Sequence, residues 1–149
     1  MNVIAEGTNT RFSHVAVAKA QPEAVWRLWT HVDTWPRWDT ELESARLDGA
    51  FLVGAKGALK GKGAPEASFE VVAFEPLVRN QISTALPLGG RLVIERRLEQ
   101  GTDGTRFTHE VRFTGFGGWL LSPFFGPRYR EALPKVMARI VALAEGAQP

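Results

Sequence analysis

Alternating hydrophobic and polar residues cover much of the chain and predict a sheet. Between Leu42 and Thr114, short extended runs are separated by glycine or proline, which is typical of antiparallel strands. A loosely alternating segment over 11–19 precedes them and predicts a first strand. Asp103-Gly104 marks the clearest hairpin, because this pair tolerates the positive φ of a tight turn. The pattern predicts a seven-stranded antiparallel meander with strands at 11–19, 42–47, 55–60, 67–74, 78–86, 91–98 and 105–114.

Helical periodicity follows the first predicted strand and begins at Pro22. Proline in the first turn of a helix loses no hydrogen bond, and apolar residues recur at intervals of three and four as far as Val32. Asp33 is placed to cap a further short turn that carries Trp35 and Trp38. Two short helices are therefore expected between the first and second strands.

The strongest helical pattern lies near the C-terminus, where apolar residues recur at helical spacing from Leu133 to Ala144. Because Pro127 and Pro134 interrupt its upstream extension, the pattern predicts a helix over 127–145 that bends near Pro134. The stretch 115–118 is glycine-rich and indicates a hinge or a strand-to-helix turn. Helices segregated on one face of an antiparallel sheet define the α+β class.

Composition limits the possible functions. A chain of 149 residues with 44% hydrophobic and 23% charged residues suits one domain spanning 1–149. It has no cysteine, which excludes disulfides and thiolate chemistry. A formal net charge of +2 does not favour nucleic acid as a partner. Neither a secretory leader nor a transmembrane segment is expected, so we expect a cytoplasmic protein.

Several segments resemble one known family. The run Val15–Trp26 is similar to the family's strand followed by Ala-x-Pro-x-x-Val-Trp, and Trp35-Pro-Arg-Trp38-Asp39 to its Trp-Pro-x-Trp-Asp/Asn segment. Phe74–Arg79 resembles its proline turn, and Gly104–His109 the start of its last strand. The family is the polyketide cyclase/dehydrase and START-like (SRPBCC) superfamily, which shares the Bet v 1 fold. The resemblance implies a helix-grip fold, in which a curved sheet wraps the long C-terminal helix around a ligand cavity.

His109 is the best single candidate for chemistry. On the last predicted strand it shares one face with Phe107, Val111 and Phe113, which points it toward the core or the cavity. Its ordinary pKa of about 6.5 would suit a general base. The alternative is a core histidine that is hydrogen-bonded to a neighbouring element.

Other candidates would contact a ligand. Arg96 lies on the apolar face of its strand and could clamp a carboxylate or enolate oxygen, or else reach solvent from the strand end. Asn80 and Thr84 share a strand face and could supply polar contacts within the cavity. The remaining candidates are apolar or aromatic, and some of them would serve packing alone: Trp35, Trp38, Phe113, Phe116, Trp119, Tyr129 and Met137.

No motif indicates a metal or a cofactor, and none is expected. The three histidines, His14, His31 and His109, are too far apart in sequence to assert a metal site. The run Lys56–Gly63 lacks the Walker A spacing, so it is interpreted as a solvated basic hairpin.

The leading hypothesis is therefore a protein that binds or carries a hydrophobic small molecule such as a lipid, a polyketide or an aromatic metabolite. One alternative is a cyclase-, aromatase- or dehydratase-like enzyme without metal, in which His109 moves protons and Arg96 or Tyr129 stabilises negative charge. Another is a protein-interaction module that uses the basic hairpin or the edge formed by Trp35 and Trp38. The oligomeric state, monomer or homodimer, is left open.

Overall fold

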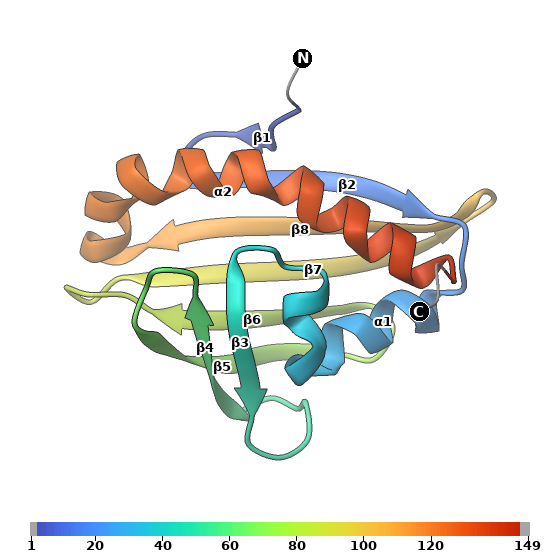
Figure 1. Ribbon diagram of the computed structural model, residues 1–149, viewed down its shortest axis with the longest axis horizontal. Helices are drawn as coiled ribbons and strands as arrows, with labels where there is room; N and C mark the ends of the chain where they lie inside the picture. Colours follow the sequence, from blue (N-terminus) through green and yellow to red (C-terminus); the bar gives the residue numbers. More distant parts are fainter. Residues whose placement is uncertain (1–2, 147–149) are drawn as a thin grey trace.

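A computed structural model describes residues 3–146 as an α+β fold (Figure 1). One antiparallel sheet of eight strands has the order β1-β2-β8-β7-β6-β5-β4-β3. The helical elements are α1 (Pro22–Thr30), the 3-10 helix η1 (Val32–Arg37) and α2 (Gly115–Ala144). The strands are β1 (Glu6–Gly7), β2 (Arg11–Ala18), β3 (Leu42–Leu47), β4 (Lys56–Gly61), β5 (Glu66–Glu75), β6 (Arg79–Ala85), β7 (Arg91–Gly101) and β8 (Gly104–Thr114).

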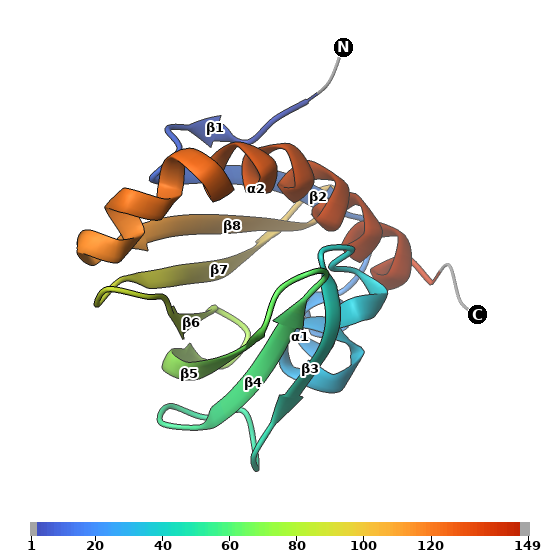
Figure 2. The same cartoon turned by 60° about the vertical axis from the view of Figure 1, so that its left-hand side comes forward.

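The sheet curls beneath α2, as the helix-grip prediction requires (Figure 2). Strand β2, the first long strand in the sequence, pairs with β8, the last strand, so that His14 lies opposite His109. The second half of α2 is joined to the α1–η1 segment, because the Arg139 guanidinium donates two hydrogen bonds to the Arg37 carbonyl at 3.0 and 2.8 Å. The helix and the curled sheet therefore enclose a space between them.

The predicted class and architecture are confirmed, although the sheet has eight strands and not seven. The additional strand, β1, has two residues and pairs with Ser13 and Phe12 of β2. A two-residue strand is too short to produce a recognisable alternation. The expected capping by Asp33 is wrong: η1 begins after His31 and has no side-chain cap.

The long helix begins twelve residues earlier than predicted, at Gly115 and not at Pro127. Pro123, Pro127 and Pro134 all lie within it. Two of the glycines that indicated a turn, Gly117 and Gly118, are buried on its inner face, where a Cβ added at Gly117 would overlap the carbonyl oxygen of Pro87. Close packing against the β6–β7 turn therefore keeps this segment helical against its low intrinsic propensity.

Candidate functional site

A cavity of about 230 Å³ lies between the concave face of the sheet and α2. Its walls come from β4 to β8, from the η1–β3 connection and from α2, and they are mostly apolar. Strand alternation explains this composition, since every second residue of β7 and β8 faces inward. The apolar lining includes Leu42, Leu59, Ala67, Ile82, Leu86, Leu92, Ile94, Val111, Phe113, Phe125, Leu133 and Val136.

Arg96 places a buried guanidinium at this cavity. Its residue is 3% exposed, and its Cζ atom lies 4.7 Å from the centre of the Trp35 ring and 5.5 Å from that of Trp38. Burial lowers the pKa of Arg96 from its ordinary value to about 10, an effect that the charge of Asp39 opposes. The side chain therefore stays positively charged at neutral pH between two aromatic rings.

Five buried side-chain polar atoms of β6 and β7 lack hydrogen-bond partners within the described part of the chain. These atoms are Nε and Nη1 of Arg96, both amide atoms of Asn80 and the hydroxyl of Thr84. Asn80 lies directly opposite Arg96 in the pairing of β6 with β7. Buried polar groups in folded proteins nearly always have partners, so these unpartnered atoms distinguish this part of the interior.

His109 lies on β8 directly opposite Arg96 and also lines the cavity. Its Nε2 atom accepts a hydrogen bond of 3.0 Å from the indole Nε1 of Trp29. Burial lowers the pKa of His109 well below its usual value, and the nearby charge of Arg96 lowers the pKa further. The ring is therefore neutral at physiological pH and carries its hydrogen on Nδ1.

Asp39 is the carboxylate whose charge raises the pKa of Arg96, although Asp39 and Arg96 do not form an ion pair. Burial raises the pKa of Asp39 to about 6, whereas a hydrogen bond of 3.0 Å from the Glu41 amide and the charge of Arg96 act in the opposite direction. Asp39 also lines the cavity. Its carboxyl group is thus poised to exchange a proton close to neutral pH.

Tyr129 of α2 closes the cavity on the helix side. Its ring stacks on Phe113 with a centroid distance of 6.3 Å and an interplanar angle of 24°. Burial raises the pKa of Tyr129, and the charges of Asp39 and Glu41 raise it further. The phenol is therefore a neutral hydrogen-bonding group.

The cavity brings together seven of the predicted site residues: Trp35, Trp38, Thr84, Arg96, His109, Phe113 and Tyr129. Four others do not line it. Asn80 and Met137 are fully buried in the interior, while Phe116 and Trp119 are 61% and 64% exposed. The aromatic edge considered as a protein contact is also absent from the surface, because Trp35 and Trp38 are each 1% exposed.

Sequence reasoning overlooked Asp39 as a site residue, although it also lines the cavity. Asp39 directly follows the Trp-Pro-Arg-Trp motif, and this adjacency was the available signal. Phe125, one of the aromatic residues that the sequence places at the junction of the last strand and the long helix, lines the cavity as well.

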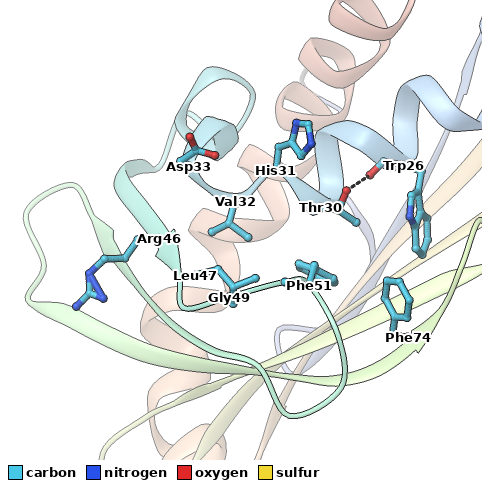
Figure 3. A pocket seen from close by; sticks show the side chains of 11 residues that line it. Trp26, Thr30, His31, Val32, Asp33, Arg46, Leu47, Gly49, Phe51 and Phe74 are labelled. Atoms are coloured by element: carbon cyan, nitrogen blue, oxygen red, sulfur yellow. Dashed lines mark hydrogen bonds between the residues drawn. The ribbon is translucent and has the colours of Figure 1, made fainter.

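A second hollow, of about 530 Å³, opens at the surface between the α1–η1 junction and the end of β3 (Figure 3). Trp26, Phe51 and Phe74 form its apolar side, and His31, Asp33 and Arg46 its polar side. The Thr30 hydroxyl on its wall donates to the Trp26 carbonyl at 3.0 Å. Among the described residues, three of the five unpartnered buried polar atoms belong to Thr84 and Arg96, which line the first cavity, and none belongs to a residue of this hollow. The first cavity is therefore the stronger candidate.

Neither a metal site nor a membrane span emerges from residues 3–146. No three histidine, aspartate or glutamate side chains in this range gather closely enough to hold a metal ion. No helix in the same range is long and apolar enough to cross a membrane.

The fold and its cavity define a helix-grip protein with an internal, mostly apolar cavity. The chain belongs to the polyketide cyclase / dehydrase and lipid transport family, whose model matches residues 9–145. Comparison with curated protein sequences gave no match.

Solved structures share this fold at low sequence identity. The hypothetical protein jhp0584 from Helicobacter pylori is 12% identical with a TM-score of 0.74, and 97% of each chain is covered. MLL2253 from Mesorhizobium loti is 16% identical with a TM-score of 0.71, over 93% of this chain and 99% of the other. DynU16, a putative protein in the dynemicin biosynthetic locus, is 17% identical with a TM-score of 0.71, over 94% of this chain and 49% of the other. At such identities the likeness concerns the fold alone.

Proposed function

We propose that this protein binds a small apolar molecule with an acidic head group in the cavity between the sheet and α2. The observation that carries the proposal is the guanidinium of Arg96, which is 3% exposed and has Nε and Nη1 without partners. A carboxylate or phenolate oxygen would accept charge-assisted hydrogen bonds from this group. Ligand binding would thereby satisfy donors whose burial destabilises the free protein.

The remainder of the cavity suits the apolar part of such a ligand. Ile94, Val111 and Phe113 extend from the sheet, and Leu133 and Val136 face them from α2. Burying apolar surface contributes about 25 cal/mol for each Å². The volume of about 230 Å³ lies below the range of about 300–1,000 Å³ that is typical of drug-sized ligands. A ligand with one or two rings, or with a short acyl chain, therefore fits the proposal best.

An enzyme of the cyclase or dehydratase type is the second candidate, because His109, Arg96 and Tyr129 line one cavity. Arg96 could stabilise a developing enolate, and Tyr129 could donate a hydrogen bond to it. However, Nε2 of His109 already accepts a hydrogen bond from Trp29, so a general base would have to use a nitrogen that is occupied. This contact favours binding over proton abstraction by His109.

The proposal can be tested with a pair of probes that differ only in charge, 2-naphthoate and 2-naphthamide. Isothermal titration calorimetry should show that the protein prefers the carboxylate by about 10- to 100-fold, the worth of one charge-assisted interaction. Arg96→Gln should remove this preference. Arg106→Gln changes the net charge equally at an exposed residue of β8 and should preserve it.

Native mass spectrometry of the purified protein provides an independent test. An acidic apolar adduct that Arg96→Gln loses would support the proposal. Equal affinity of the wild-type protein for both probes would contradict it, as would a preference for the carboxylate that survives Arg96→Gln.

A further inference from the structure

The first half of α2 has an inverted distribution of side-chain size. Its inner face carries small buried residues, Gly117, Gly118, Ser122 and Gly126. Its outer face carries Phe116, Trp119 and Phe124, which are 61%, 64% and 75% exposed. A surface helix whose outer face meets only water has the opposite arrangement, with its large apolar residues facing the core. The outer side chains therefore point to a contact that the protein makes with something else.

The glycines on the inner face join this helix closely to the β6–β7 turn. The Gly117 amide donates to the Leu88 carbonyl at 3.2 Å, and a Cβ at Gly90 would overlap the Gly118 amide nitrogen. Leu88, 63% exposed, is held at a φ of 60°, a conformation that is uncommon for a residue other than glycine. The exposed apolar residues of this helix and turn are here called the aromatic face: Leu88, Phe116, Trp119, Leu120, Phe124 and Phe125.

Charge around the aromatic face favours an anionic partner. Residues 113–127 contain no charged side chain. At the adjoining strand ends, Arg11 lies opposite Arg112, and Arg91 lies opposite the last residue of β8. Two acids lie among them: Glu110 contacts Arg11 at 3.3 Å and Arg112 at 2.8 Å, and Glu95 lies 3.9 Å from Arg112. Three arginines against two acids leave an excess of one positive charge at these strand ends.

We propose that the aromatic face docks on the surface of an anionic lipid bilayer. Exposed tryptophan and phenylalanine beside arginine are the composition of helices that lie in the plane of a membrane interface. The first half of α2 lies at the edge of the molecule (Figure 2). Its side chains Phe116, Trp119 and Phe124 are all more than half exposed.

The aromatic face also adjoins the ligand cavity. Phe125 lines the cavity and is 43% exposed, so it belongs to both surfaces. Docking would therefore bring the apolar lining of the cavity next to the hydrocarbon region of the bilayer. This inference extends the proposed function, because it concerns where an apolar ligand would enter, but it stands on separate residues.

The test is cosedimentation of the full chain with vesicles of phosphatidylcholine containing about 30% phosphatidylglycerol. The wild-type protein should bind, more weakly in high salt. Trp119→Ser combined with Phe124→Ser should reduce the partition coefficient by about tenfold or more. Leu52→Ser combined with Val53→Ser removes residues of similar exposure, 54% and 62%, from the β3–β4 loop and should have no effect.

Light scattering in the absence of vesicles separates the bilayer from the other possible occupants. The proposal is overturned if the wild-type protein does not bind vesicles, or if the Trp119/Phe124 variant binds them equally well. A dimer that this variant converts to a monomer, without vesicle binding by the wild type, would instead assign the face to self-association. The same variant should still bind 2-naphthoate in solution, so failure here is distinguishable from failure of the proposed function.

Discussion

Replacing Arg96 with methionine should make the free protein more stable while removing its affinity for acidic ligands. Methionine keeps an unbranched, flexible side chain that can pack between the rings of Trp35 and Trp38. It also removes a buried charge whose Nε and Nη1 have no partner within the protein. Replacement of buried charges by apolar residues of similar volume is often neutral or stabilising.

The magnitude follows from the environment of Arg96. Its pKa is lowered from its ordinary value to about 10, which corresponds to a cost of about 3 kcal/mol for folding with the charged form. This penalty applies at every pH below about 10, because the side chain is then charged in both the folded and the unfolded states. Attraction to the two tryptophan rings offsets about 1–2 kcal/mol. The variant should therefore gain about 1–2 kcal/mol.

Urea unfolding at neutral pH measures this gain directly, and calorimetry should show a melting temperature higher by about 2–8 °C. Arg106→Met, on the outer face of β8, is the matched control and should change the unfolding free energy by less than about 0.5 kcal/mol. A loss of about 1 kcal/mol or more in Arg96→Met would refute the reasoning. It would mean that Arg96 stabilises the free fold and that the cavity has no need of an acidic ligand.

Three further predictions concern the cavity and α2. In the wild-type protein, affinity for 2-naphthoate should rise as the pH falls from about 8 to about 5, because a bound anion favours the protonated form of Asp39, whose pKa is about 6. Asp39→Asn should flatten this pH dependence in calorimetry. The same pH dependence in the wild-type protein and the variant would contradict the role of Asp39. His109→Ala should lower that affinity by less than about tenfold and keep the preference for the carboxylate over the amide, whereas loss of the preference would make His109 its determinant. Gly117→Ala should lower the free energy of unfolding in urea by about 1–3 kcal/mol, because the added methyl overlaps the Pro87 carbonyl. The control Gly101→Ala, with its Cβ 3.6 Å from the nearest atom, should lower it less. Equal losses in the two variants would exclude the overlap as the cause.

The sequence predicts the sheet well because strand alternation is a local property. On β8, the alternation places His109, Val111 and Phe113 on one face, and all three line the cavity. The same rule correctly directs Arg96 inward. The start of α2 could not be predicted in this way, since glycine and proline normally break helices. Its helical form depends on contact with the β6–β7 turn, about thirty residues earlier in the chain.

The polar environment of the cavity was the less predictable part of the site. The bond between Trp29 and His109 joins residues that are 80 positions apart. Likewise, the influence of Asp39 on Arg96 arises only when the η1–β3 connection packs over β7. No local pattern encodes such pairings, because they depend on the curvature of the sheet. Candidates could therefore be named from the sequence, while their protonation states required the fold.

Asp39 and Arg96 are displaced from their ordinary pKa values in the directions that favour their neutral forms. If Asp39 and Arg96 formed a close ion pair, each charge would favour the charged form of the other group. Each influences the other at a distance, and burial dominates for both. An acidic ligand placed against Arg96 would raise the pKa of Arg96 back toward its ordinary value. The same negative charge would raise the pKa of Asp39 further above its ordinary value. Ligand binding should therefore be coupled to proton uptake at Asp39, which would make retention tighter in mildly acidic surroundings and release easier above neutral pH.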